Sequence, residues 1–233
     1  MAERRCKALV YYSDTLWAGG SVKTIRLTRR EIVENCIGGG LLLSAIPLSQ
    51  TQLLAAWQDG EAKAAKPTPR DVLGPFFKKG APNSSVLHTV GSAGFPLRVT
   101  GKVTNTRGDK MPGARIDIWQ ADHAGLYDLE GFRYRTALIT QESSEYAVET
   151  ILPGHYDDRP AQHIHYMISA PGHKTLITQA YFATDPFFEG NPDKNFGKRS
   201  IVSHRDLVRT VTLIEAPGTP RAAITFDICL EKA

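Results

Sequence analysis

Residues 153–173, PGHYDDRPAQHIHYMISAPGH, gather side chains that bind metals or transfer protons. The stretch holds four of the chain's seven histidines and two of its eight tyrosines. His163 and His165 are separated by one residue, so in a β-strand both imidazoles project from the same face. Two parallel imidazoles are a common half of a metal site. An isolated pair of this kind more often combines one surface histidine with one buried histidine, so the neighbouring residues must decide between the two interpretations.

The residues around the histidine pair offer few conventional co-ligands. A facial triad for ferrous iron needs a carboxylate, and a zinc hydrolase needs a third histidine or an acid. The residues after the pair, YMISAPG, contain no acid, while Asp157 and Asp158 precede it beside an arginine that would compete for them. His155 and His173 each follow a glycine in a turn, and we expect both to be bystanders. Tyrosines flank the pair instead.

Alternating apolar residues predict the elements that must hold these side chains. From residue 94 onward, period-two patterns indicate short strands, and glycine and proline interrupt them at short intervals. Few short helices and many turns predict an all-β domain, an antiparallel β-sandwich of about 160 residues. We expect Trp119 to fill its core and Tyr134 to be the strand tyrosine that faces a substrate. The clearest strand patterns are PLRVTGKV, ARIDIWQ, HIHYMIS and AITFDICL.

Several motifs, in their order along the chain, resemble those of the intradiol ring-cleavage dioxygenases. They are GPFF, PGARIDIWQADHAGLYD, TILPGHY, RPAQHIHYMISAPGH and TQAYF. The resemblance spans residues 72–230, almost the entire predicted domain. It is greater for the iron-bearing subunit of protocatechuate 3,4-dioxygenase and small secreted relatives than for the catechol-cleaving branch, which carries a helical N-terminal region. Because the same scaffold occurs in non-catalytic modules, function must be argued from the site.

The resemblance implies a non-haem Fe(3+) centre held by Tyr127, Tyr156, His163 and His165. Ferric iron is a hard cation, and phenolate oxygen is a hard anionic donor that holds the metal in this oxidation state. A free tyrosine has a pKa near 10, and a bound trivalent cation can keep the phenol ionised at neutral pH. The implied substrates are a catecholic compound and O2, and cleavage between the two hydroxyl-bearing carbons gives a cis,cis-muconate-type diacid. Tyr156 is implied to leave the metal when the catechol binds and to accept a substrate proton.

Arg159 and Gln179 are the other catalytic candidates that the resemblance implies. The family arginine stabilises the carbanionic ring and stands three residues before the first histidine, whereas Arg159 stands four residues before His163. A loop arginine paired with Asp157 or Asp158 is the alternative interpretation. Gln179 either matches a family glutamine near the substrate or is a polar position on an edge strand.

Two other classes of function stay open on the sequence. One is a non-catalytic β-sandwich binding module, which would have no use for four intact ligand positions. The other is a metal enzyme of another class, an extradiol-type ferrous oxygenase or a zinc hydrolase, which would need a carboxylate or a third histidine as a ligand. The formal net charge of +4 comes without a long basic run, so no nucleic-acid partner is expected. Three scattered cysteines are too few for a disulfide framework. A homo-oligomer is compatible with these features.

The N-terminal residues have the pattern of an export signal. Arg29 and Arg30 precede an apolar run from Ile37 to Leu48, which is too short to span a bilayer. The paired arginines resemble a twin-arginine signal, which directs the export of folded proteins. We therefore expect a periplasmic or secreted protein with no membrane association beyond export, or a cytoplasmic one if the segment is a helix packed on the domain. The predicted division is an N-terminal extension at 1–56, a linker at 57–70 and a dioxygenase-like domain at 71–233.

Overall fold

The computed structural model describes residues 64–88, 91–156, 159–214 and 220–233. The predicted extension at 1–56 and the first half of the predicted linker lie outside the described residues and stay predictions. Residues from the second half of the linker hydrogen bond to the domain: the amide of Ala65 donates to the carbonyl of Thr106 at 2.8 Å, and that of Thr68 to Cys229 at 3.0 Å. Every helix in the described part of the chain is too short or too polar to cross a membrane.

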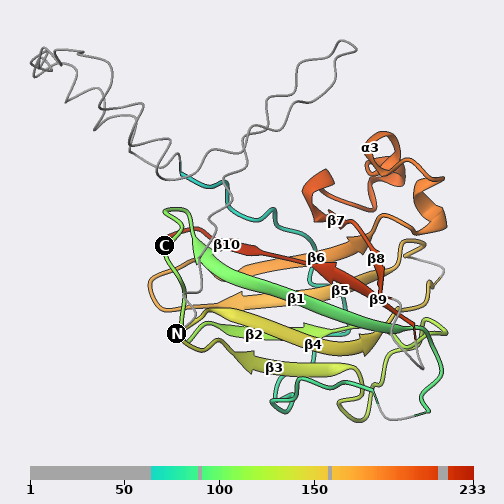
Figure 1. The fold of residues 1–233 in the computed structure, drawn as a ribbon, viewed down its shortest axis with the longest axis horizontal. Coiled ribbons are helices and arrows are strands. Elements are labelled where there is room, and N and C mark those ends of the chain that lie inside the picture. The colour runs from blue at the N-terminus through green and yellow to red at the C-terminus, as the bar shows by residue number, and fades with distance from the viewer. Residues whose placement is uncertain (1–63, 89–90, 157–158, 215–219) are drawn as a thin grey trace, which may run out of the picture. The chain divides into compact units, whose positions relative to one another are not determined.

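Two five-stranded sheets form the domain (Figure 1). The first sheet has the order β10-β1-β9-β8, with β4 also paired to β1, and the second has the order β3-β2-β5-β6-β7. The first sheet contains β1 (Pro96–Asn105), β4 (Glu145–Ile151), β8 (Thr212–Ile214), β9 (Arg221–Thr225) and β10 (Ile228–Leu230). The second contains β2 (Arg115–Trp119), β3 (Arg135–Ile139), β5 (His163–Ser169), β6 (Leu176–Phe182) and β7 (Val208–Arg209).

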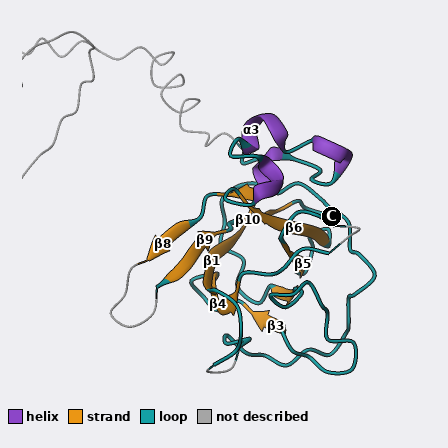
Figure 2. Cartoon of the chain, turned by 90° about the vertical axis from the view of Figure 1, so that its right-hand side faces the viewer, coloured by secondary structure: helices purple, strands orange, loops and turns teal. Residues whose placement is uncertain are grey.

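The described helices are one turn long and gather at one end of the sandwich (Figure 2). They are η1 (Pro186–Phe188), α3 (Pro192–Asn195), η2 (Lys198–Ser200) and η3 (Arg205–Leu207), all between β6 and β7. The all-β sandwich with few short helices is therefore confirmed. Both sheets are mixed rather than purely antiparallel, because β1 pairs in parallel with β9 and β10, and β6 pairs in parallel with β7. Parallel neighbours need a crossover connection. The chain between β1 and β9 provides it by passing through the second sheet.

The core lies between the two sheets and follows the alternation in the sequence. In β5, Ile164, Tyr166 and Ile168 point into it and are fully buried. From the first sheet, Ile224, Ile228 and Leu230 are likewise buried, as is Phe226 between β9 and β10. Tyr134 also belongs to this core, with 5% of its surface exposed and a left-handed φ of 56°. The expectation that Tyr134 faces a substrate is therefore wrong.

The opposite face of the second sheet carries buried polar and aromatic side chains. The strand register aligns four of them in one row across the sheet: Arg135 in β3, Trp119 in β2, His165 in β5 and Gln179 in β6. Trp119 is buried, but it stacks on His165 and does not belong to the core between the sheets. The prediction that Trp119 fills that core is wrong. Trp119 is buried on the outer face of the sheet instead, because that face is covered as well.

The cover is the segment of residues 69–78, which we call the covering segment. It is held to the sheet by hydrogen bonds to two strands, β6 and β3. The amide of Asp71 donates to the carbonyl of Ile177 at 2.9 Å, and the side-chain amide of Gln179 donates to the carbonyl of Val72 at 2.6 Å. Arg135 donates from Nη1 to the carbonyl of Phe76 at 2.6 Å. The functional face is thus enclosed between the sheet and an extended piece of chain.

Candidate metal centre

The two histidines of β5 converge on one point. His163 donates from Nδ1 to the carbonyl of Ala161 at 2.7 Å, which leaves the lone pair on its Nε2. That Nε2 lies 3.1 Å from Nε2 of His165. Burial lowers the pKa of His163 to about 4 and the pKa of His165 well below its ordinary value, so both rings are neutral at pH 7. Two neutral imidazoles with their Nε2 atoms this close suit a shared cation.

The ring of His165 is held between the sheet and the covering segment. Trp119 stacks on it with a centroid distance of 4.9 Å and an interplanar angle of 4°. On the covering segment, a Cβ added to Gly74 would lie 3.1 Å from Cε1 of His165, and the φ of Gly74 is +70°. A glycine is therefore required at this position of the GPFF motif, because any side chain would strain the backbone and press on the imidazole.

Both candidate tyrosines adjoin the histidine pair. The ring of Tyr127 lies 5.9 Å from that of Tyr156 and 6.2 Å from that of His165, and the ring of Tyr156 lies 5.8 Å from that of His163. The four residues predicted as ligands therefore form one cluster, although they come from β5 and two separate loops. Burial, followed by the proximity of Tyr156, raises the pKa of Tyr127 far above its ordinary value. In the absence of a cation this phenol stays protonated.

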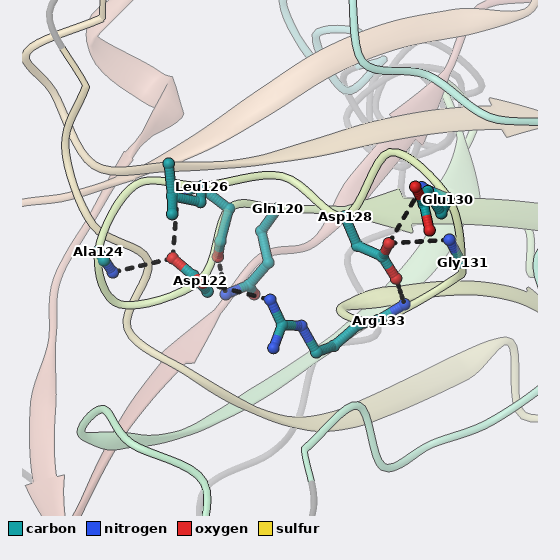
Figure 3. Close-up of polar contacts among 9 residues, drawn as sticks. Gln120, Asp122, Ala124, Leu126, Asp128, Glu130, Gly131 and Arg133 are labelled. Carbon is teal, nitrogen blue, oxygen red and sulfur yellow. Dashed lines mark hydrogen bonds and ion pairs between the residues drawn. The ribbon is translucent and has the colours of Figure 1, made fainter.

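Asp122 fixes the loop that carries Tyr127 (Figure 3). Its carboxylate accepts the amide hydrogens of Ala124 at 2.9 Å and Leu126 at 3.0 Å. Its backbone carbonyl accepts the amide hydrogen of Gly154 at 2.7 Å, from the loop that carries Tyr156. One buried aspartate thus holds both tyrosine loops.

A second aspartate, Asp128, organises the far side of the same loop (Figure 3). Its carboxylate accepts the amide hydrogens of Gly131 at 2.8 Å and Arg133 at 2.9 Å, and these bonds lower its pKa. Its carbonyl accepts a hydrogen bond from Nη2 of Arg135 at 3.1 Å. The ammonium of Lys78, from the covering segment, donates to the carbonyls of the three residues that follow Asp128.

Arg135 is a functional candidate that the sequence analysis missed. It is buried, with 3% of its surface exposed, and its guanidinium lies 5.9 Å from the ring centroid of Tyr127. Its two hydrogen bonds join the covering segment, at Phe76, to the Tyr127 loop, at Asp128. The sequence does hold a signal for this residue, namely an arginine at the start of the mostly apolar strand RTALI. A buried arginine needs partners, so its position indicates a polar contact in the folded protein.

Arg159 and Gln179 lie together at the edge of this cluster. Nη2 of Arg159 donates to Oε1 of Gln179 at 2.5 Å and to the hydroxyl of Tyr181 at 2.8 Å. Gln179 is fully buried in β6, directly opposite His165. The alternative pairing of Arg159 with Asp157 or Asp158 concerns residues outside the described ranges.

The remaining histidines differ in their surroundings. His155 places Nε2 3.1 Å from Oδ1 of the buried Asp185, and it lines an open groove of about 440 Å³ together with Tyr156. His173 donates locally, from Nδ1 to the carbonyl of Pro171 at 2.9 Å. Within the described ranges, no group of three or more His, Cys, Asp or Glu side chains is placed to hold a metal. A site of the ferrous-triad or three-histidine zinc type is therefore not formed by these residues.

Comparison with known proteins places this architecture among oxygenases. A family model described as "Dioxygenase" matches residues 72–232. The chain is 32% identical to a hydroxyquinol 1,2-dioxygenase of Nocardioides simplex over 222 residues, which cover 83% of this chain and 73% of that protein. It is 33% identical to a catechol 1,2-dioxygenase of Acinetobacter baylyi over 149 residues, which cover 52% of this chain and 48% of that protein. The chain thus spans about half the length of the catechol 1,2-dioxygenases it matches.

Solved structures give the same result. The dioxygenase domain of a dioxygenase–carbohydrate-binding protein fusion from Streptomyces sp. SirexAA-E is 33% identical, with a TM-score of 0.61 over 72% of this chain and 100% of that chain. Catechol 1,2-dioxygenase from Pseudomonas arvilla C-1 is 25% identical, with a TM-score of 0.64 over 78% of this chain and 67% of that chain.

Proposed function

The chain belongs to the intradiol ring-cleavage dioxygenase family, and we propose that it binds Fe(3+) and cleaves a catecholic ring between the two hydroxyl-bearing carbons. O2 is the co-substrate, and a cis,cis-muconate-type diacid is the product. The observation that carries this proposal is the convergence of the two Nε2 atoms of His163 and His165, 3.1 Å apart, beside the rings of Tyr127 and Tyr156. The names of the relatives support a simple catechol or hydroxyquinol as the substrate class.

The donor set fits a ferric ion. Two phenols and two neutral imidazoles provide two hard anionic oxygens and two nitrogens once the phenols ionise. Burial raises the pKa of Tyr127, and a trivalent cation at the centre would reverse that shift by stabilising the phenolate. When bound, the ferric ion supplies a Lewis acid that withdraws electron density from the catechol oxygens.

The two tyrosines differ in their surroundings, which supports different roles for them. Tyr127 stacks on Phe76 of the covering segment, with a centroid distance of 4.2 Å and an interplanar angle of 18°. Tyr156 lines the open groove beside His155. We therefore assign Tyr156 as the residue that would leave the metal as a phenolate when the catechol binds and whose Oη would then accept a catechol proton to become a neutral phenol, with Tyr127 as the fixed ligand.

Arg159 provides positive charge beside the ligand cluster. Its guanidinium is held by Gln179 and Tyr181 on β6, the strand next to the histidine pair. A fixed cation at this place stabilises negative charge that develops on the bound ring without reorganising during the reaction. Gln179 orients Arg159 and, through Val72, fixes the covering segment that excludes water.

Two measurements test the proposal. Purified, iron-loaded protein is expected to be red-brown from charge transfer between tyrosinate and ferric iron, and the Tyr127→Phe, Tyr156→Phe double variant is expected to lose that colour. An iron-loaded protein without colour would overturn the two-tyrosinate centre. A product assay then separates the reaction classes, because a muconate indicates intradiol cleavage and a yellow semialdehyde indicates extradiol cleavage.

We also propose export to the periplasm or the medium, on the strength of Arg29 and Arg30 before their short apolar run. Replacing both arginines with lysine is expected to retain the protein in the cytoplasm, as fractionation of expressing cells would show. Equal amounts outside the cytoplasm for both proteins would refute this location.

A further inference from the structure

Tyr181 lies beside the candidate metal centre and is not one of its four candidate ligands. It belongs to β6 and pairs across the sheet with His163, and the two rings are 5.9 Å apart. The side chain is fully buried. A phenylalanine would fill the same space and make the same ring contact, so the hydroxyl group needs a separate explanation.

The hydroxyl of Tyr181 is the centre of a buried polar network. It accepts a hydrogen bond from Nη2 of Arg159 at 2.8 Å. Its single hydrogen has two side-chain acceptors within reach and is donated to one of them at a time, Oε1 of Gln179 at 2.9 Å or Oδ2 of Asp71 at 3.1 Å. The carbonyl of Ile201 lies 3.2 Å away. All three neighbours of the hydroxyl other than Arg159 are acceptors, so the guanidinium is the one donor that completes the network.

Among the described residues, the hydrogen bonds that hold the Arg159 side chain come from this network. Arg159 lies outside the regular strands, joined to Tyr156 by a single β-bridge in which its amide donates to the carbonyl of Tyr156 at 2.8 Å. A long arginine side chain on a loop samples many rotamers unless hydrogen bonds hold its guanidinium group. Both hydrogen bonds that its guanidinium donates within the described part of the chain go to β6, at Gln179 and Tyr181.

The same hydroxyl connects the covering segment to the site. Asp71 belongs to that segment, and its Oδ2 also accepts a hydrogen bond from the hydroxyl of Ser203 at 3.2 Å. Tyr181 therefore stands between an anion, Asp71, and a cation, Arg159. The hydroxyl therefore accepts a hydrogen bond from the guanidinium and has the Asp71 carboxylate within reach of its own hydrogen.

We propose that Tyr181 is a positioning residue for the reaction, whose hydroxyl fixes the Arg159 guanidinium beside the metal centre and links it to Asp71 of the covering segment. The inference rests on the proposed function for its catalytic consequence, while the link between Tyr181 and Arg159 rests on the geometry alone. Tyr181 itself does not touch the reacting atoms in this scheme.

The test is a double-mutant cycle with Tyr181→Phe, Arg159→Ala and the combined variant, on iron-loaded protein with catechol and O2. Removing one hydrogen bond to a charged group should lower kcat about tenfold. KM and the tyrosinate charge-transfer band of the free enzyme should stay unchanged, because the ligands are intact. In the Arg159→Ala background, Tyr181→Phe should have no further effect. The matched control is Tyr146→Phe, which removes a buried hydroxyl bound to the carbonyl of Phe226 in the core, and it should leave kcat unaffected.

Three outcomes would overturn the proposal: a Tyr181→Phe enzyme with wild-type kcat, effects of the two single substitutions that multiply in the double variant, or loss of the charge-transfer band in Tyr181→Phe. If the wild-type protein cleaves no catechol, the proposed function fails instead. The same cycle, measured as urea unfolding of the iron-free variants, then decides whether the two side chains are coupled. Additive changes in stability would overturn the link, and non-additive changes would support it.

Discussion

Gly125 and Gly154 bring the loops of the two candidate tyrosine ligands into backbone contact. A Cβ added to Gly154 would lie less than 3.0 Å from the amide nitrogen of Gly125, and a Cβ added to Gly125 would overlap the carbonyl of His155. The carbonyl of Asp122 accepts a hydrogen bond from each glycine, at 3.1 Å from Gly125 and 2.7 Å from Gly154. The spacing of Tyr127 and Tyr156 is therefore set by backbone packing between their loops.

The first prediction concerns this contact. Gly154→Ala is expected to lower the free energy of unfolding by about 2 to 3 kcal/mol, since the methyl group overlaps backbone atoms that have no free space to move into. It should also weaken the tyrosinate colour of the iron-loaded protein, because the loops must separate. The control is Gly197→Ala, where a Cβ meets nothing within 4 Å and φ is −77°. Equal unfolding midpoints in urea for the two variants would show that the loops are not in contact.

The second prediction concerns Asp122. Asp122→Ala removes the acceptor of two amide hydrogens, from Ala124 and Leu126, and should cost about 1 to 2 kcal/mol of stability. Asp122→Asn keeps one side-chain oxygen and should cost about half as much. Iron retention against a chelator should fall in the same order. Identical retention by both variants and the wild type would exclude a role for Asp122 in holding the tyrosine loop.

The third prediction concerns Arg135, whose guanidinium bridges the carbonyls of Phe76 and Asp128. Arg135→Lys cannot form both hydrogen bonds in the same geometry, so we expect a loss of about 1 to 3 kcal/mol in unfolding free energy. Faster loss of iron to a chelator should accompany it. Arg107→Lys is the control, because that side chain is 76% exposed and its ion pair with Asp109 is at the surface. A chelation rate that is the same in both variants would contradict the bridging role.

The fourth prediction concerns the pH dependence of the iron-free protein. Burial lowers the pKa of His163 to about 4 in the folded state, whereas the unfolded value is 6.5. Between these values the unfolded chain binds more protons, so stability falls as the pH is lowered from 6.5 to 4. His163 alone should account for roughly 3 kcal/mol of this loss. Urea unfolding at pH 7, 5.5 and 4.5 measures it.

The control for this measurement is His163→Asn, whose amide can still donate to the carbonyl of Ala161. The variant should lose less stability than the wild type over the same pH range, because its side chain does not titrate. Parallel pH profiles for the two proteins would mean that other groups cause the acid destabilisation.

The sequence predicted the strands, and the position of His163 and His165 on one strand face, because both depend on local periodicity. In β5, the alternation of His163, Ile164, His165 and Tyr166 separates a functional face from a core face, and the structure has this alternation. The turns at glycine and proline were also visible. Strand alternation and turns can both be recognised from a few neighbouring residues in the sequence.

What the sequence did not reveal depends on contacts between distant segments. Alternation placed Trp119 on a face without indicating that the covering segment would bury that face too. The partners of Tyr181 lie 22 residues away, at Arg159, and 110 residues away, at Asp71. The sequence therefore carries no local signal that distinguishes Tyr181, since only the folded sheet aligns it with His163.

The proposed iron binding depends on the alignment of the strands in the second sheet. That alignment sets the row formed by Arg135, Trp119, His165 and Gln179. If β5 slipped by one residue against its neighbours, Ile164 and Tyr166 would take the outer face, and both imidazoles would turn toward the core. Such a misassembled sheet would retain its strands but would have no metal centre. Colour in a purified sample would therefore serve as a quality check on folding, because only molecules with the correct strand alignment would be coloured.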